Sequence, residues 1–279
     1  MSCLFCFGLG YSAQALGRQL IAQGWRVGGT ARTGDSAKAM AAAGFEAVVF
    51  DGHAPSLDAS DALKHATHVL LSIPPDADGD PVLLHHARDL EASPSIEWIG
   101  YLSTVGVYGD HGGAWIDETA PATPAQERSR WRLAAEDKWL ALGQRSGKRA
   151  QVFRLPGIYG AGRSAIERVR EGTAQRIVKA GQVFNRVHVD DIAAALAAAI
   201  AGRGAHDIYN VTDSEPAPPE IAFEDARLSR MAACFYAENK RVSNARMRNE
   251  LGVTLKFPSY REGLQAILAQ WTASAARTP

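Results

Sequence analysis

The chain of 279 residues contains few cysteines, and their number and placement argue against several classes of protein. There are only three, Cys3, Cys6 and Cys234, and an odd count in a chain this long does not suggest a disulfide framework. The count fits a reducing compartment, so we expect a cytoplasmic protein. Cys3 and Cys6 form a C-x-x-C pair, but an odd offset along a strand points their side chains to opposite faces. We therefore expect two small buried residues there and no metal or redox centre.

Long apolar stretches and net charge are lacking as well. No run of 18 or more apolar residues occurs, and the Ala-rich stretch 191–202 is too short to span a bilayer. The first apolar run breaks at Gly8 and has no basic leader, so we expect no signal peptide. Thirty basic and thirty acidic residues cancel, which gives no general argument for a nucleic-acid or membrane partner. Because 46% of the residues are hydrophobic, the chain can bury a sizeable core.

Short apolar runs alternate with longer helical patterns over most of the chain. The runs typical of buried strands are 3–8, 25–31, 46–51, 68–75, 95–104, 149–160 and 206–213. The main helical patterns are 12–24, 36–44, 82–92, 128–147 and 188–202. This alternation implies right-handed crossovers and a parallel sheet that is covered on both faces. We predict an α/β fold, a Rossmann-type doubly wound parallel sheet with a small C-terminal substrate lobe.

The alternation ends near residue 212, and this predicts two parts. We expect a Rossmann domain over 1–212 and a small, mostly helical lobe over 213–279, with parts of 161–186 as candidates to join the lobe. The proline-rich, acidic stretch 213–220 is expected to be a connector. Helical patterns in the lobe are 231–240 and 260–270. We expect the lobe to close over the carboxyl edge of the sheet.

Gly8 and Gly10 lie between the first strand and the first helix. Gly8 allows a tight turn out of the strand, and Gly10 lacks a Cβ, so a pyrophosphate can approach the backbone. Ala13 is small at the third position of the G-x-G-x-x-G pattern, which allows helix and strand to pack closely. With Tyr11 and Ser12 it opens a helix whose N–H groups and partial positive charge attract phosphates. This context predicts a dinucleotide site; a tight turn before a packed helix is the alternative.

The end of the second strand indicates which dinucleotide binds. NAD sites place Asp or Glu there to hold the ribose hydroxyls, whereas this strand ends in Arg32 and Thr33, with Asp35 beyond them. Arg32 can pair with a 2′-phosphate through its planar guanidinium. We therefore favour NADP over NAD, with Arg32 and Thr33 as cofactor-binding residues. A solvated surface arginine is the alternative.

Residues 3 to 212 resemble the short-chain dehydrogenase/reductase superfamily, and most closely its extended branch, the NAD-dependent epimerase/dehydratase family. Besides GLGYSA, the ordered motifs are FDG at 50–52, LSIPP at 71–75, LSTVGVYG at 102–109, IDET at 116–119, RLPGIYG at 154–160 and VHVDDIA at 187–193. The resemblance implies further contacts to the cofactor. Asp51 would lie at its adenine, and Ser72, Ile73 and Pro74 would lie next to the middle of the cofactor. Pro156, Gly157 and Ile158 would lie beside its nicotinamide.

The resemblance also implies a hydride transfer assisted by a Tyr, a Lys four residues later, and a Ser or Thr at the fifth strand's end. Thr104 falls on the Ser/Thr position, with Ser103 beside it. Aligned on the LAAE at 133–136, however, the Tyr position holds Arg128 and the Lys position holds Arg132. Arginine is a poor general acid or base at neutral pH, although Arg132 can still bind the ribose. The chain thus resembles atypical members with a degenerate active site.

Other groups are candidates for moving the proton. Tyr108 lies just past the strand end, Tyr159 lies in the nicotinamide segment and His111 lies in a following loop; packing or loop roles are the alternative for each. His188 is expected to anchor a loop to a helix. Asp191 is expected to cap that helix, where its negative charge is favourable.

The basic run 128–138 interleaves arginines with Trp131, a pattern that also occurs in nucleic-acid binding. Neighbouring acidic residues favour a solvated helix face instead and no nucleic-acid partner. A further alternative is that its arginines face the cleft and hold an anionic substrate such as a sugar nucleotide. His85 and His86 have no Cys or carboxylate at ligand spacing, so we expect no metal.

Two functions from different classes follow. The first is an NADP-dependent oxidoreductase or epimerase/dehydratase-like enzyme that acts on a small, nucleotide-linked hydroxyl or carbonyl compound, with Thr104 polarising the substrate oxygen. The second is a sensor that binds NADP(H) without turnover, which the missing Tyr/Lys pair favours. The fold alone does not decide between them. The family often forms homodimers through the long helix, here residues 131–142, but the sequence leaves the oligomeric state open.

Overall fold

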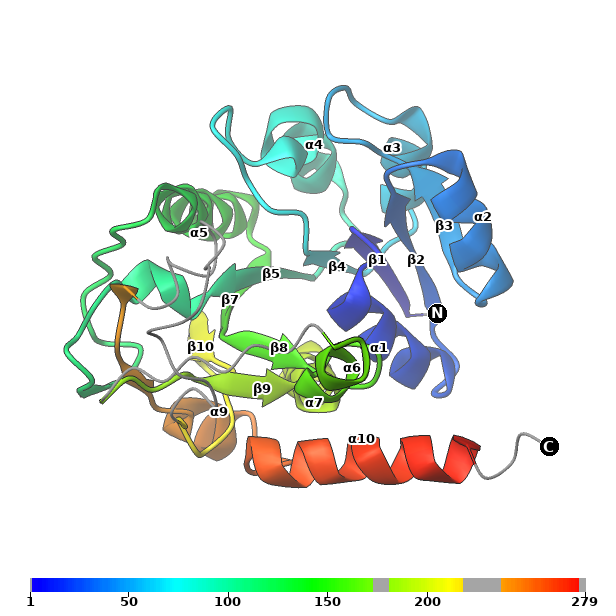
Figure 1. The fold of residues 1–279 in the computed structure, drawn as a ribbon. Coiled ribbons are helices and arrows are strands. Elements are labelled where there is room, and N and C mark those ends of the chain that lie inside the picture. The colour runs from blue at the N-terminus through cyan, green and yellow to red at the C-terminus, as the bar shows by residue number, and fades with distance from the viewer. Residues whose placement is uncertain (1, 173–180, 218–236, 276–279) are drawn as a thin grey trace.

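A seven-stranded parallel sheet forms the centre of the computed structural model, which describes residues 2–172, 181–217 and 237–275 (Figure 1). The strand order is β10-β7-β5-β4-β1-β2-β3, and every neighbouring pair is parallel. The strands are β1 (Cys3–Phe7), β2 (Arg26–Ala31), β3 (Glu46–Val49), β4 (His68–Leu71), β5 (Trp98–Thr104), β7 (Arg149–Leu155) and β10 (Ile208–Asn210). The predicted doubly wound Rossmann-type sheet is confirmed.

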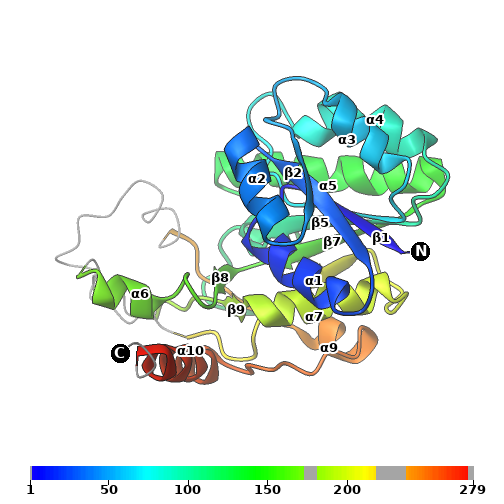
Figure 2. The ribbon, with the colours of Figure 1, turned by 90° about the vertical axis from the view of Figure 1, so that its right-hand side faces the viewer.

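Helices cover both faces of this sheet, as the views in Figures 1 and 2 show. One face carries α1 (Tyr11–Ile21) and α7 (Val189–Ile200), and the other carries α3 (Leu57–Leu63), α4 (Pro81–Ala92) and α5 (Glu127–Ser146); α2 (Gly34–Ala42) lies against β2 and β3. On the first face Leu16 and Leu196 lie in one buried cluster. On the second, Tyr101 and Trp139 lie in another. Apolar residues at helical spacing thus bury the strands from both sides.

The expected single strand at 149–160 is wrong, because it is two strands in two sheets. β7 ends at Leu155, and Pro156 has no N–H with which to continue a ladder. β8 (Gly157–Tyr159) then leaves the main sheet and pairs in parallel with β9 (Arg186–His188). A further parallel pair joins β6 (Trp115–Ile116) to β11 (Arg241–Val242). Both small sheets connect the main sheet's loops to later parts of the chain.

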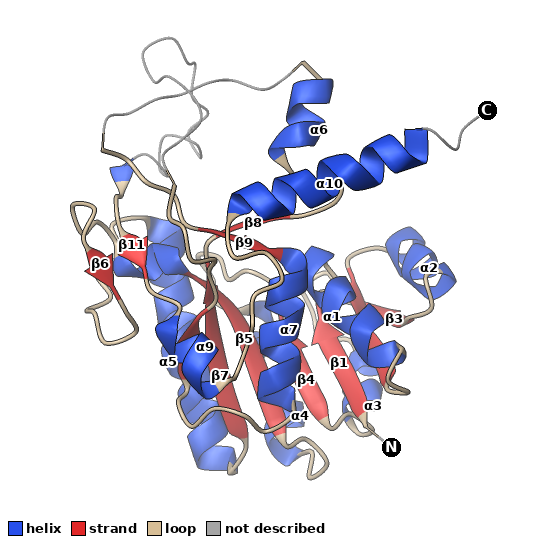
Figure 3. Ribbon diagram, turned by 90° about the horizontal axis from the view of Figure 1, so that it is seen from below, coloured by secondary structure: helices blue, strands red, loops and turns tan. Residues whose placement is uncertain are grey.

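The remaining elements are η1 (Val105–Tyr108), α6 (Ala165–Arg170), α9 (Ala245–Glu250) and α10 (Tyr260–Ala275). Figure 3 shows α6, α10 and the β8–β9 pair beyond the ends of the main strands. α10 confirms the helical pattern at 260–270, while most of the pattern at 231–240 lies outside the described residues. The division at residue 212 stays a prediction. No helix among the described residues is both long and apolar enough to cross a membrane.

The first turn of α7 differs from expectation. His188 is the N-cap, as an anchoring histidine should be, and its Nδ1 accepts from the Asp190 N–H at 3.1 Å. Asp191 is not the cap, because it lies inside the first turn. It is buried and accepts from the N–H groups of Lys256 at 2.7 Å and Phe257 at 3.2 Å. Burial raises the pKa of Asp191 to about 6. Asp191 thus fastens the C-terminal segment to α7.

Candidate functional site

Gly8 and Ser72 meet where the strand order reverses, at the carboxyl ends of β1 and β4. Ser72 Oγ donates to the Gly8 carbonyl at 2.6 Å, and the Gly8 N–H donates to Thr30 Oγ1 at 2.8 Å. Gly8 has φ +90°, and a Cβ on it would lie 2.7 Å from Ser72 Oγ. Only glycine fits here without strain. In open α/β sheets this reversal point is where ligands bind.

Gly10 is different, because the space around it is open. Its φ of −80° suits any residue, and a Cβ on it would meet no atom within 4 Å. As the N-cap of α1 it makes no side-chain hydrogen bond, and no described residue accepts from the N–H groups of Tyr11, Ser12 or Ala13. An open backbone position above free donors and a positive helix end suits a phosphate. These residues therefore fit the pyrophosphate of a dinucleotide.

Tyr11 links this loop to a distant segment. Its hydroxyl donates to the Ala161 carbonyl at 2.9 Å, and the Arg163 guanidinium lies 5.7 Å from its ring centroid. The phenol thus joins the start of α1 to the turn that follows β8. No local pattern predicts this contact, because 150 residues separate the two partners.

The end of β2 presents an unpaired cation. Arg32 is exposed, and its side chain has no partner among the described residues. Thr33 is occupied as the N-cap of α2, since its Oγ1 accepts from the Ser36 N–H at 3.2 Å. At the end of the neighbouring β3, Asp51 is exposed and accepts from the His53 N–H at 2.9 Å. Arg32 is therefore free to bind a ligand at this edge.

Ser103 and Thr104 end β5 in different environments. Ser103 is buried and its Oγ donates to Glu136, which pairs with Arg154 at 2.6 Å. Ser103 therefore belongs to a buried network that holds α5 against the sheet. Thr104 is only half-buried, and its Oγ1 accepts from the Gly106 N–H at 3.1 Å. Its own proton has no acceptor among the described residues, so Thr104 can donate to a ligand.

Ser129 was missed by the sequence analysis. A Cβ on Gly106 would lie 2.8 Å from Ser129 Oγ and 3.3 Å from Thr104 Oγ1, so both hydroxyls lie around one point. Ser129 belongs to the first turn of α5, one residue after Arg128. Its place next to Arg128 in the sequence was the one feature that could have marked Ser129 as a site residue.

The two tyrosines proposed as substitute acids face protein acceptors. The Tyr108 hydroxyl is fully buried and donates to Asn210 Oδ1 at 2.8 Å. Burial raises the pKa of Tyr108, against the lowering effect of the Arg154 guanidinium 4.7 Å from its ring centroid. The Tyr159 hydroxyl donates to the Ser259 carbonyl at 3.3 Å, and burial raises its pKa too. This geometry favours the packing roles for both.

The arginines of α5 divide into bound and free side chains. Arg132 donates to the Leu102 carbonyl and lies against the Tyr101 ring, 5.8 Å from its centroid. Arg130 donates to the Ala125 carbonyl at 2.6 Å. Arg128, which the sequence analysis places at the Tyr position, is exposed and has no side-chain partner among the described residues. Only Arg128 of these three is therefore available to an anion.

Of the adjacent histidines His85 and His86, His86 contacts protein partners through both ring nitrogens. His86 is buried; its Nε2 accepts from the Ser56 N–H at 3.2 Å, and its Nδ1 lies 2.9 Å from Asp89 Oδ2. The described residues include no group of three or more His, Cys, Asp or Glu side chains that suits a metal ion. Cys3 and Cys6 are buried on β1, and burial raises the pKa of the Cys6 thiol.

The model of the NAD dependent epimerase/dehydratase family matches residues 76–212. Residues 76–212 of the chain belong to this family. A solved structure from Silicibacter pomeroyi, described as a functionally unknown conserved protein, shares 45% identity over 97% of this chain and 99% of its own, with a TM-score of 0.85. No curated protein matches the chain.

Two more distant structures share the fold with this epimerase/dehydratase family member. UDP-glucose 4-epimerase of Thermotoga maritima, solved with UDP-glucose, has 16% identity and a TM-score of 0.72, covering 99% of this chain and 100% of its own. UDP-glucuronic acid 4-epimerase of Bacillus cereus, solved with NAD, has 16% identity and a TM-score of 0.71, covering 97% and 99%.

The family binds a nicotinamide dinucleotide, which agrees with the open loop at Gly10. The placement of Arg128 and Arg132 at the family's Tyr and Lys positions stays a prediction from the sequence. The remaining assigned positions lie at the same sheet edge: Ile73 and Pro74 follow β4, Pro156 follows β7, and Gly157 and Ile158 belong to β8.

Proposed function

We propose that the protein binds NADP(H) at the carboxyl edge of the sheet and acts as an oxidoreductase or epimerase/dehydratase-like enzyme. Its substrate is a small, nucleotide-linked hydroxyl or carbonyl compound. The observation that carries the proposal is the open backbone at Gly10, above the free N–H groups of α1. Arg32 would hold the 2′-phosphate, and Ser72 would fix the loop at Gly8. When bound, the cofactor supplies hydride chemistry.

Thr104 has the free hydroxyl proton that the proposed chemistry needs. It would donate this proton to the substrate oxygen and so orient and polarise it. Ser129 Oγ, like Thr104 Oγ1, lies beside Gly106 and would share this role. Arg128 would pair with the anionic part of the substrate. The described parts of the predicted lobe, such as α10 and the β8–β9 connection to it, would supply the opposite wall of the cleft.

A sensor without turnover is the second candidate, and a specific observation favours it. The hydroxyls of Ser103 and Tyr108 and the guanidinium of Arg132 all bond inside the protein. Among the described residues, the site then keeps its dinucleotide loop but none of these three groups is free to act as a general base. A sensor must bind oxidised and reduced cofactor with different affinities, because a ligand shifts a state only by its differential affinity.

Arg32→Gln is expected to weaken NADP⁺ binding by about 10- to 100-fold, the value of a lost charge-assisted contact. NAD⁺, which has no 2′-phosphate, should bind to both proteins alike. Calorimetric titration of both cofactors measures this. Lys38→Gln is the matched control, because Lys38 is also an exposed cation on the neighbouring helix. An unaltered protein that binds NAD⁺ as tightly as NADP⁺ would contradict the assignment.

NADPH oxidation across a panel of carbonyl compounds and sugar nucleotides should separate the two functions. For the enzyme we expect turnover with at least one compound, and a loss of about 100-fold in kcat for Thr104→Val without a change in NADP⁺ affinity. Val keeps the shape of Thr but cannot donate a proton. Tight cofactor binding with no turnover, and unequal affinities for NADP⁺ and NADPH, would favour the sensor. Equal affinities would remove the sensor.

A further inference from the structure

The turn at residues 160–163, between β8 and α6, lies against the first residue of α1. The backbones of Gly160 and Arg163 close this turn with two hydrogen bonds, of 3.2 and 3.0 Å. The Tyr11 hydroxyl donates to the Ala161 carbonyl inside it at 2.9 Å. A Cβ on Gly160 would collide with this hydroxyl, so only glycine lets the turn come so close to α1.

The acidic side chains around this turn already have partners. Glu167 and Asp190 are the carboxylates whose charges act on Tyr11. Glu167 accepts from the Gly162 N–H at 3.0 Å and from the N–H of the α6 N-cap at 2.7 Å, as part of a capping box. Asp190 pairs with Lys256 at 2.8 Å. The turn is therefore shaped by Glu167 without a ligand, and neither acid is used to neutralise Arg163.

Arg163 thus places an unpaired cation next to the glycine loop. Its side chain is exposed and has no hydrogen-bond or ion-pair partner among the described residues. Its guanidinium lies 5.7 Å from the ring centroid of Tyr11, within the range of a cation–π contact. Helical side chains lean toward the N-terminus of their helix, so the Tyr11 ring leans toward the loop at Gly10. The ring therefore holds the guanidinium beside the end of α1 whose N–H groups are free.

The charge of a dinucleotide gives this cation a use. A diphosphate carries a full negative charge on each phosphate, whereas a helix N-terminus supplies only about half an elementary charge. Arg32 is assigned to the 2′-phosphate at the end of β2, so the diphosphate still needs a cation. A guanidinium is suited to this because its planar fork can donate two parallel hydrogen bonds to one phosphate.

We propose that Arg163 pairs with the diphosphate of the bound dinucleotide, so that the turn 160–163 is a second part of the phosphate site besides the glycine loop. This rests on the proposed binding of NADP(H). The two arginines then have separate tasks. Arg32 distinguishes NADP from NAD, whereas Arg163 holds both cofactors equally.

Arg163→Gln should weaken the binding of NAD⁺, NADP⁺ and ADP-ribose to the full chain by the same factor, about tenfold. ADP-ribose carries the diphosphate but no nicotinamide, so an equal loss locates the contact at the diphosphate. Arg32→Gln should instead affect NADP⁺ alone. Arg163→Lys should restore part of the affinity, because it keeps the charge but not the planar fork. Calorimetric titration measures all of these affinities, and circular dichroism checks the fold of each variant.

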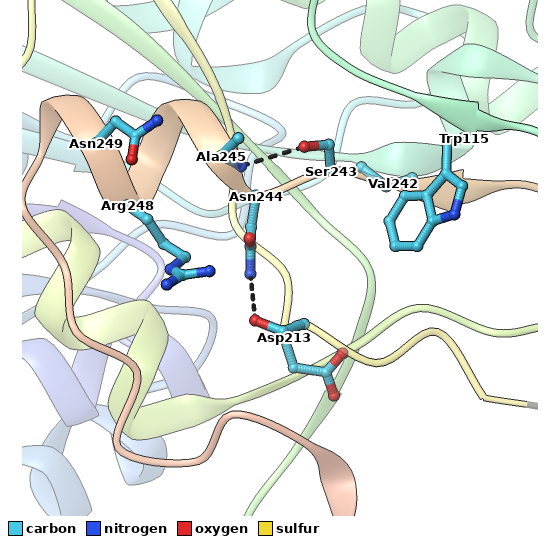
Figure 4. A pocket seen from close by; sticks show the side chains of 9 residues that line it. Trp115, Asp213, Val242, Ser243, Asn244, Ala245, Arg248 and Asn249 are labelled. Carbon is cyan, nitrogen blue, oxygen red and sulfur yellow. Dashed lines mark hydrogen bonds between the residues drawn. The ribbon is translucent and has the colours of Figure 1, made fainter.

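Arg248→Gln is the matched control. Arg248 is also an exposed arginine without a side-chain partner among the described residues, but it lies on α9 and lines a cavity of about 340 Å³ (Figure 4). This cavity lies beside β10, and β7, β5 and β4 separate β10 from β1, which the glycine loop follows. Removing this charge should therefore change none of the three affinities by more than about twofold.

Three results would overturn the assignment of Arg163 and leave the proposed function standing. The first is that Arg163→Gln binds all three compounds as tightly as the unaltered protein does. The second is a loss confined to NAD⁺ and NADP⁺, which would place Arg163 at the nicotinamide. The third is an equal loss in Arg248→Gln, which would reduce the effect to general charge. If the unaltered protein binds none of the three compounds, both proposals fail together.

Discussion

Gly10→Ser should abolish tight dinucleotide binding while leaving the fold intact. We expect the affinity for NADP⁺ to fall by about 100-fold or more, because one N–H donor to the phosphate is lost and the serine side chain takes up the space of the phosphate. The unfolding midpoint without cofactor should be unchanged or slightly higher. Calorimetry measures the first effect, and thermal unfolding followed by circular dichroism measures the second.

The reason lies in the two separate roles of this position. The φ and ψ of Gly10 are open to any residue, and a Cβ there meets no protein atom. Serine is also a better N-cap than glycine, so it would bond the N–H of Ser12 or Ala13 and gain a few tenths of a kcal/mol. The same bond removes a donor from the phosphate, and the side chain fills the space that the phosphate needs.

Gly8→Ala is the contrasting change. It forces an alanine to φ +90° and places its Cβ against Ser72 Oγ, so it should lower the free energy of unfolding by about 1–3 kcal/mol as well as weaken binding. Gly10→Ser should therefore weaken binding without loss of stability, whereas Gly8→Ala should reduce both binding and stability. Unchanged NADP⁺ affinity in Gly10→Ser would show that the dinucleotide does not pass over this loop.

Glu136→Ala should have the largest effect on stability, a loss of about 3–5 kcal/mol. Glu136 and Arg154 have side chains only 1% and 5% exposed. Removing the carboxylate leaves the guanidinium buried without a counter-charge and leaves Ser103 Oγ without its acceptor. Small domains have only about 5–15 kcal/mol in total, so this variant should unfold at a much lower urea concentration.

Glu91→Ala is the matched control, since Glu91 also pairs with an arginine, Arg145, but at the surface. Exposed pairs contribute about 0–1 kcal/mol. The double change Glu136→Leu with Arg154→Met should be milder than Glu136→Ala alone, because no charge is left buried. If the two glutamate variants lose equal stability, the buried pair does not hold α5 as the geometry indicates.

Local chemistry explains why so much of the fold was predictable. The short apolar runs predicted the seven main strands. The glycine motif predicted that position 8 requires a residue without a Cβ, because the chain turns tightly there out of the first strand. The bend after Leu155 was harder, because Pro156 reveals where a strand ends but not where the next one pairs. Long-range contacts were out of reach: nothing near Asp191 in the chain indicates that Lys256 and Phe257 supply its donors.

The candidate site divides in the same way. The dinucleotide loop and Thr104 lie in continuous motifs, whereas the contact between Tyr11 and Ala161 joins segments 150 residues apart. Arg132 shows a different difficulty. The alignment gave its place on the helix, but only the packing against Tyr101 shows that its guanidinium turns toward β5.

The hydrogen bond from Tyr11 to Ala161 has a thermodynamic consequence. It connects the first residue after the proposed phosphate-binding loop to the turn that leads into α6. A ligand that shifts the start of α1 therefore strains or releases this turn. A second ligand held by the turn changes the binding free energy at the loop by the same amount. Reciprocity of this kind makes the order of loading immaterial at equilibrium: whichever molecule arrives first changes the affinity for the other by the same factor.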